Sequence, residues 1–345
     1  MNDVVLRTER GLGRITLNRP RALNALTPEM VRRMDAALAE WEADDSVRAI
    51  LIDGAGERGL CAGGDIRGIY EHAKAGQDGP KTFWREEYLL NHRISRFPKP
   101  YVALMDGIVM GGGVGVSAHG SVRVVTDRST VCMPEVGIGF LPDVGGTYLL
   151  SRAPGELGTH AALTAARLTA ADAIHFGLAD HYVPAAKLPE LVEALLEADD
   201  LDAVVRAHAE APPASQLAQE RRWIDPCYAA DTVEEIVSRL RTSGEPAGEA
   251  AAKELLDKSP TSVKVTLKAL RTAKVLDGLG ECLDLEYRIA CVLLTGHDLV
   301  EGIRAAIIDK DRNPLWSPDR IEDVDRADVE RCFAWLGADE LGLSG

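Results

Sequence analysis

Two glycine-rich segments are places where the main chain can bind a ligand directly. The first, 61–65, reads Cys-Ala-Gly-Gly-Asp, and the second, 110–115, reads Met-Gly-Gly-Gly-Val-Gly. Each follows an apolar stretch typical of a buried strand. Glycine lets backbone N–H groups approach a ligand closely, and such groups aimed at one carbonyl oxygen form an oxyanion hole. The pattern therefore predicts chemistry on an acyl group.

Two carboxylates follow the second glycine segment. Glu135 comes directly after Met133-Pro134, and Asp143 comes directly after Pro142. A carboxylate can take a proton from water as a general base or attack an acyl carbon as a nucleophile, and the sequence leaves both routes open. Alone, Glu135 also fits an exposed strand end, and Asp143 fits a turn. Together with both glycine segments, they favour a catalytic pair.

The composition is that of an ordinary globular protein and excludes some partners. Of the 345 residues, 46% are hydrophobic and 27% are charged. The length allows one main domain with a smaller addition, because single cores seldom exceed about 250–300 residues. Acidic residues outnumber basic ones by 54 to 39, which gives a net charge of −15. With no overall basic field, we expect neither nucleic acid nor a membrane as a partner.

Targeting and metal-binding patterns are missing from the sequence. No apolar run reaches the ~18 residues of a membrane span, and the first residues do not have the pattern of a signal peptide. The six cysteines form no CxxC pair, and the eight histidines have no metal-ligand spacing. We therefore expect a cytoplasmic protein with reduced thiols that uses no metal and no redox cofactor.

The predicted elements place both glycine segments between a strand and a helix. Helices are expected to begin at Thr27-Pro28 and Asp65, and amphipathic helices are expected further along the chain at 188–196 and 233–240. This order favours repeated ββα units followed by a mainly helical part, with a boundary near residue 200. Strands are expected at 13–18, 47–52, 101–105, 122–126 and 130–133.

Several motifs, taken together, resemble the crotonase (enoyl-CoA hydratase/isomerase) superfamily. Three further motifs, at 83–88, 142–146 and 308–316, are most similar to the 3-hydroxyisobutyryl-CoA hydrolases of that superfamily. The resemblance implies an α/β fold, with a crotonase-like spiral of ββα units over 1–200 and a mainly helical region over 201–345. The motifs shared with the whole superfamily lie at 18–26, 61–67, 105–115 and 133–146.

The resemblance also implies roles for particular residues. Backbone N–H groups of Gly64 and Gly112 would form the oxyanion hole for the thioester oxygen. Glu135 and Asp143 would be catalytic, with Asp143 positioning water or giving a proton to the departing sulfur of CoA. Glu87 would contact the polar end of the acyl group, so the substrate-binding residues would be Glu87, Gly112, Glu135 and Asp143.

The implied reaction is hydrolysis of 3-hydroxyisobutyryl-CoA, in valine degradation, to 3-hydroxyisobutyrate and CoA. Coenzyme A is part of this substrate, so no separate cofactor is implied. Superfamily members often form trimers or hexamers, which implies a homo-oligomer of unspecified size.

One departure separates the chain from the hydratases of the superfamily. Hydratases carry a second catalytic glutamate at the position matched here by Gly115. Without that carboxylate, addition of water across a C=C bond lacks half of its acid–base pair. The departure favours thioester cleavage, and the alternative is an enoyl-CoA hydratase/isomerase that acts on another acyl-CoA.

Two other classes of function fit parts of the sequence less well. The segment 115–119 is similar to a nucleophile elbow, but His119 occupies the position where that motif needs glycine. Ser117 is therefore predicted to be a small, packed residue. A noncatalytic CoA-binding protein is the third class, and the presence of both Glu135 and Asp143 disfavours it.

Overall fold

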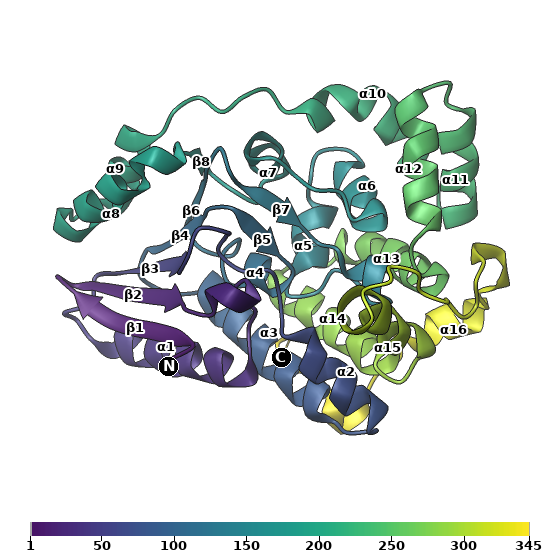
Figure 1. Cartoon of the computed structure of the whole chain (residues 1–345), viewed down its shortest axis with the longest axis horizontal. Coiled ribbons are helices and arrows are strands. Elements are labelled where there is room, and N and C mark those ends of the chain that lie inside the picture. The colour runs from purple at the N-terminus through teal and green to yellow at the C-terminus, as the bar shows by residue number, and fades with distance from the viewer. Residues whose placement is uncertain (1, 345) are drawn as a thin grey trace. The chain divides into compact units, whose positions relative to one another are not determined.

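The computed structural model describes residues 2–344 (Figure 1), so the outermost residues of the two predicted domains, 1 and 345, lie outside it. The chain divides into two compact units that alternate along the sequence. The first comprises Met1–Gly64, Glu86–Cys132 and Arg167–Ser215, and the second comprises Asp65–Arg85, Met133–Ala166 and Gln216–Gly345. The division of the chain at residue 200 stays a prediction.

A six-stranded sheet forms the centre of the first unit. Its order is β1-β2-β3-β4-β6-β8, with β1 and β2 antiparallel and every other neighbouring pair parallel. The strands are β1 Val4–Glu9, β2 Leu12–Leu17, β3 Ala49–Gly54, β4 Tyr101–Met105, β6 Val122–Val125 and β8 His181–Tyr182. A second, parallel sheet pairs β5 (Ile108–Met110) with β7 (Thr130–Cys132). The strands predicted from the sequence are confirmed as β2, β3, β4, β6 and β7.

Helices of the first unit pack on this sheet. The predicted start of α1 (Pro28–Ala43) is confirmed, because the Thr27 side chain accepts a hydrogen bond from Met30 N at 3.3 Å and proline occupies the first turn. The amphipathic helix α8 (Leu188–Glu197) buries Leu191 and Leu195 in a core shared with β3 and β4. The remaining helices are α4 Gly112–Gly115, α7 Ala170–Phe176 and α9 Leu201–His208, with 3-10 turns at Pro20–Ala22 and Ala185–Lys187.

The second unit is built from helices. The helix predicted at 233–240 is α11, and it packs beside α12 (Figure 1). Within residues 2–344, no helix is both long and apolar enough to cross a bilayer. The helices are α2 Ile66–Lys74, α5 Gly146–Ser151, α6 Leu157–Thr164, α10 Gln216–Tyr228, α11 Val233–Thr242, α12 Pro246–Leu256, α13 Pro260–Ala273, α14 Leu279–Leu293, α15 His297–Ile303 and α16 Arg326–Arg331.

Short turns complete the second unit, and one helix contains a boundary between the units. The 3-10 turns are Glu135–Ile138, Ile321–Asp323 and Gly337–Asp339, and a π-helical turn, Arg304–Ile308, follows α15. The helix α3 (Gly79–Ser95) contains the boundary that follows Arg85.

Candidate active site

Backbone hydrogen bonds join the two glycine segments in the first unit. Cys61 N donates to Ile108 O at 3.1 Å, and Met110 N donates to Cys61 O at 2.9 Å. On the other side of the first segment, Leu26 N donates to Gly63 O at 2.8 Å. These bonds fix the path of 61–64 beside β5 and bring the two glycine segments together.

Gly64 and Gly112 are neighbours in this arrangement. A Cβ atom built on Gly112 would lie 3.5 Å from the Gly64 nitrogen. The residues that precede them, Gly63 and Gly111, have φ angles of +108° and +49°, which side chains disfavour. Gly112 is the first residue of α4, where backbone N–H groups have no acceptor within the helix. The pair is therefore suited to donate to a ligand oxygen, and that role stays a prediction.

Glu87, on α3, lies against the same glycine pair. Its side chain is 2% exposed, and its Oε1 would be 2.5 Å from a Cβ atom on Gly112. Burial raises the pKa of the neighbouring Cys61 thiol to about 12, and the charge of Glu87 adds to the increase. A buried carboxylate thus borders the two amides, and position 112 has no space for a side chain.

Glu135 is held in a tight turn of the second unit. It is 6% exposed and is the first residue of the 3-10 turn Glu135–Ile138. Phe140 N, just after this turn, donates to Glu135 O at 3.0 Å. Gly139 follows with a φ of +75°, and a Cβ atom there would lie 2.3 Å from the backbone of Asp298 on α15. The turn is therefore packed closely on α15, which fixes the backbone of Glu135.

Asp143 lies in the next loop of the same unit and is also buried, with 6% of its surface exposed. Gly146 N donates to Asp143 O at 2.6 Å. The two residues between them, Val144 and Gly145, have φ angles of +51° and +82°. Left-handed φ values are uncommon for valine, so other contacts must hold this loop.

The carboxylate that holds the loop was missed in the sequence. Glu286, on α14, is fully buried and accepts hydrogen bonds from Gly145 N at 2.7 Å and Thr147 N at 2.9 Å. Burial raises its pKa to about 8, the hydrogen bonds from Thr147 and Gly145 oppose that increase, and the charge of Asp143 adds to it.

The spacing of apolar residues around position 286 could have identified Glu286 as a buried carboxylate on a helix. Cys282, Leu283, Ile289 and Ala290 are three or four residues away from it in sequence, and all four are buried. A carboxylate on the apolar face of a predicted helix needs partners, because burying a charge without them is costly. The identity of those partners could not be read from the sequence.

Trp84 and Arg85, from the motif at 83–88, pack within the second unit. The Trp84 ring stacks on Phe140, with 4.9 Å between ring centroids, at the end of the turn that contains Glu135. The Arg85 guanidinium lies 4.9 Å from the centroid of the Tyr287 ring and donates to Glu340 O at 2.7 Å. Trp84 and Arg85 therefore have structural roles.

The motif at 308–316 forms an ordered loop around one arginine. Arg304 donates to Glu301 Oε1 at 2.8 Å, to Asp309 at 2.7 Å and to Asp311 at 2.6 Å. Glu301 Oε1 also accepts a bond from Leu315 N at 2.7 Å. These contacts explain the closely spaced charges of the motif without a ligand.

Ser117 is not arranged as a nucleophile. It is fully buried after α4, and its Oγ donates to Gly113 O at 2.6 Å. The prediction of a small, packed residue is confirmed. As for metals, no group of three or more His, Cys, Asp or Glu side chains in residues 2–344 is arranged to hold an ion.

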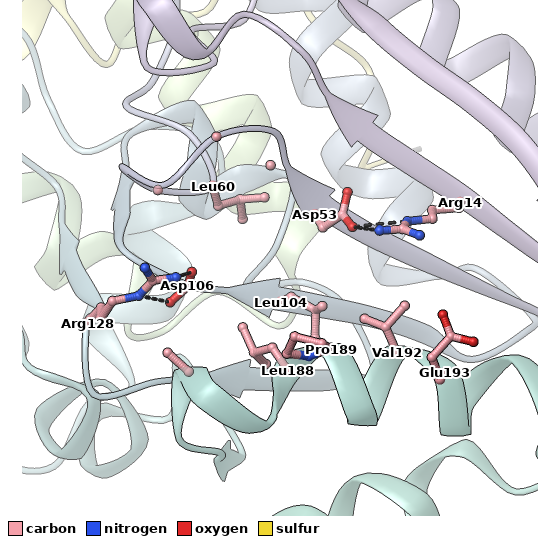
Figure 2. Close-up of a pocket in the computed structure, with 14 residues that line it drawn as sticks. Arg14, Asp53, Leu60, Leu104, Asp106, Arg128, Leu188, Pro189, Val192 and Glu193 are labelled. Atoms are coloured by element: carbon pink, nitrogen blue, oxygen red, sulfur yellow. Dashed lines mark hydrogen bonds and ion pairs between the residues drawn. The ribbon is translucent and has the colours of Figure 1, made fainter.

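A cavity of about 470 Å³ lies elsewhere in the first unit. Figure 2 shows its polar walls, where Arg14 pairs with Asp53 and Arg128 pairs with Asp106, and its apolar wall from α8. Each of these arginines is already neutralised by a carboxylate. The residues that line this cavity do not include Gly64, Gly112 or Glu87.

Comparisons with known proteins identify the family of this chain. The family model for enoyl-CoA hydratase/isomerase matches residues 12–333. The mitochondrial 3-hydroxyisobutyryl-CoA hydrolase of Rattus norvegicus is 43% identical over 353 residues, which cover 98% of this chain and 90% of the relative.

Two solved structures share the whole fold. A carnitinyl-CoA dehydratase from Mycobacterium thermoresistibile is 54% identical, with a TM-score of 0.96 and complete coverage of both chains. An enoyl-CoA hydratase from Rhodobacter sphaeroides is 44% identical, with a TM-score of 0.93 and 99% coverage of both chains. The predicted crotonase-like α/β fold is thereby confirmed, and the chain belongs to the enoyl-CoA hydratase/isomerase family.

Proposed function

We propose that this protein hydrolyses the thioester of 3-hydroxyisobutyryl-CoA and releases 3-hydroxyisobutyrate and CoA, in valine degradation. The observation that carries the proposal is the 43% identity to a 3-hydroxyisobutyryl-CoA hydrolase along 98% of the chain. Glu87 supports it, because a buried carboxylate beside the glycine pair is a suitable acceptor for the hydroxyl group of the acyl chain.

The two amides stabilise charge on the thioester oxygen in this mechanism. As the carbonyl carbon becomes tetrahedral, its oxygen gains negative charge, and the N–H groups of Gly64 and Gly112 donate to it. Removing one donor of an oxyanion hole typically costs about 2.7–4 kcal/mol of transition-state stabilisation. The close approach of Gly64 N to Gly112 supports a shared acceptor.

The two carboxylates carry out the bond changes. Glu135 either takes a proton from the attacking water or attacks the thioester carbon itself to form a mixed anhydride that water then cleaves. Asp143 positions the water or gives a proton to the departing sulfur. Both routes consume one water and break the C–S bond. Hydroxylamine trapping of an acylated Glu135, located by mass spectrometry, distinguishes the anhydride route from direct attack by water.

Hydration of an enoyl-CoA is the second candidate, because the two solved structures described above are named as a dehydratase and a hydratase. Gly115 argues against it. This residue is fully buried within α4 and supplies no carboxylate at the position that the second glutamate of the hydratases would occupy.

The deciding experiment compares substrates with one purified protein. We expect free thiol to be released from 3-hydroxyisobutyryl-CoA, while the enoyl absorbance of crotonyl-CoA stays constant. Carnitinyl-CoA is included as a third substrate, with formation of an enoyl absorbance as its readout. Loss of enoyl absorbance from crotonyl-CoA, or its appearance from carnitinyl-CoA, without thiol release would contradict the proposal and support the second candidate.

We also propose that the enzyme is a cytoplasmic homo-oligomer that needs no metal or separate cofactor. The rat relative is named as mitochondrial, so fractionation of cells that produce the protein is the test of location. Light scattering of the purified protein gives the number of subunits. Thiol release is expected to be unchanged after dialysis against a chelator, and a loss that added metal restores would contradict this part of the proposal.

A further inference from the structure

The loop that contains Asp143 has an unfavourable backbone conformation. Val144 and Gly145 are consecutive residues with φ angles of +51° and +82°. Left-handed conformations cost free energy for side chains other than glycine and persist only where surrounding contacts enforce them. Val144 is 1% exposed, so it is fixed within the second unit. Because Asp143 directly precedes these residues, the direction of its side chain depends on the contacts that hold them.

Glu286 supplies those contacts from a distant part of the sequence. One oxygen, Oε2, accepts from Gly145 N at 2.7 Å. The other, Oε1, accepts from Thr147 N at 2.9 Å and from Thr147 Oγ1 at 2.5 Å. Both oxygens of a single carboxylate thus bind the segment directly after Asp143, across 141 residues of sequence. Glu286 is fully buried, so water does not compete for these bonds.

The charge of Asp143 also acts on Glu286. Burial is the main cause of the raised pKa of Glu286, and the charge of Asp143 adds to it. Burial likewise raises the pKa of Cys282, one turn earlier on α14, and the charge of Glu286 adds to that increase. An apolar side chain would be sufficient if position 286 served packing alone, because a buried charge is costly. The choice of a carboxylate at this position is explained by its three donors, all of which belong to the loop.

We propose that Glu286 is a positioning residue that acts through Asp143, by holding 143–147 in the conformation needed for thioester cleavage. This inference rests on the proposed function, in which Asp143 acts on the attacking water or the departing sulfur. Glu286 itself accepts bonds from the loop and touches no reacting atom in this scheme. Its removal is expected to affect turnover more than substrate binding.

The chain offers a matched control on the same helix. Asp284 is also buried, at 3% exposed, and also accepts two backbone hydrogen bonds, from Leu343 N and Ser344 N at 2.9 Å each. Its partners belong to the end of the chain instead of the Asp143 loop. Glu286→Gln and Asp284→Asn therefore make the same chemical change at two buried carboxylates, and only one of them contacts the loop.

The test measures kcat and KM for thiol release together with thermal stability. For Glu286→Gln we expect kcat to fall about 10- to 100-fold, KM to change less than about 3-fold, and the pH dependence of kcat to shift. Asp284→Asn should lower the melting temperature while leaving kcat within about 2-fold of the parent. Equal kcat in the parent and Glu286→Gln would overturn the proposal, as would equal losses in the two variants.

A double-mutant cycle with Asp143→Asn tests whether Glu286 acts through Asp143. If it does, Glu286→Gln should add almost no further loss in the Asp143→Asn background. A full additional loss would overturn the proposal. If Glu286→Gln does not fold, Thr147→Val removes one donor to Glu286 and keeps the backbone N–H, and it should give a smaller loss of kcat with the same dependence on Asp143.

The parent enzyme separates failure of this inference from failure of the proposed function. If the parent releases no thiol but hydrates crotonyl-CoA, the proposed function fails. The same cycle is then measured on hydration, where unchanged kcat in Glu286→Gln overturns the positioning role and a non-additive loss with Asp143→Asn supports it.

Discussion

The first unit contains the glycine pair, Gly64 and Gly112, whose main-chain amides we propose as the oxyanion hole, whereas the second unit contains Glu135 and Asp143, which we propose as the catalytic carboxylates. Around Gly64 and Gly112 the backbone is fixed by local bonds, and a side chain at position 112 would clash with Glu87. Around Asp143 the backbone is fixed by Glu286, from 141 residues away in the sequence. Added atoms at Gly112 should therefore reduce activity through the main-chain amides. Around Asp143, the loss of hydrogen-bonding groups should reduce activity.

The largest effect is expected from Glu135→Gln, which removes the basic group and keeps the shape of the side chain. We expect kcat for thiol release to fall on the order of 10⁴-fold, at the upper end of what acid–base catalysis contributes. Binding of CoA, measured by calorimetry, should change little, because free CoA lacks the acyl group on which Glu135 is proposed to act. Retention of more than about a tenth of the activity would show that Glu135 is not the catalytic carboxylate.

Gly112→Ala is expected to give the next largest effect, within the first unit. The new Cβ would lie 2.5 Å from Glu87 Oε1, so the amide or the carboxylate must move. We expect kcat/KM to fall about 10²–10³-fold, as when one oxyanion-hole donor is lost. Measurement of kcat/KM for thiol release checks this.

The matched control for Gly112→Ala is Gly68→Ala, on α2. A Cβ atom at position 68 meets no other atom within 4 Å. It should leave turnover unchanged and stabilise the helix by up to ~1 kcal/mol, because alanine has the higher helix propensity. Similar losses of kcat/KM in both variants would indicate that a side chain added at any glycine lowers activity. The loss in Gly112→Ala would then not identify an oxyanion-hole donor.

The structure around the glycine segments was easier to predict from the sequence than the structure around Asp143, for a physical reason. Strand patterns and glycines are local, so most strands of the first unit were predicted correctly. The structure differs at the glycine segments, because β3 ends at Gly54, before the segment 61–65, and the short strand β5, which precedes Gly111, was not predicted. The bonds from Gly145 and Thr147 to Glu286 are not local, and no periodicity pairs residues so far apart. The cavity walled by α8 was missed for the same reason, because its lining comes from separated segments.

A smaller effect, on stability alone, follows from the titration of Glu286. Its pKa of about 8, against an ordinary value of 4.5, means that the folded state holds a proton that the unfolded state releases. Stability should therefore fall as the pH rises from about 4.5 through about 8, by an amount on the order of a few kcal/mol. Glu286→Gln cannot titrate, so its melting temperature should depend less on pH across this window.

Melting curves of the parent and Glu286→Gln at several pH values measure this difference. His160 contributes with the opposite sign, because burial lowers its pKa to about 4, and stability gained through it rises with pH up to about 6.5. That contribution is common to both proteins and cancels when they are compared. Parallel curves for the two proteins would contradict the raised pKa of Glu286.

The smallest effect is expected from Ser117→Ala, which changes a side chain beside the amide pair without touching its donors. The lost bond from Ser117 Oγ to Gly113 O should cost about 1 kcal/mol in the free energy of unfolding. Turnover should stay within about 2-fold of the parent, since the backbone N–H groups that are proposed to bind the oxygen are unchanged. A loss of turnover above about 10³-fold would instead identify Ser117 as a nucleophile, and the reaction would then use a side chain of the first unit.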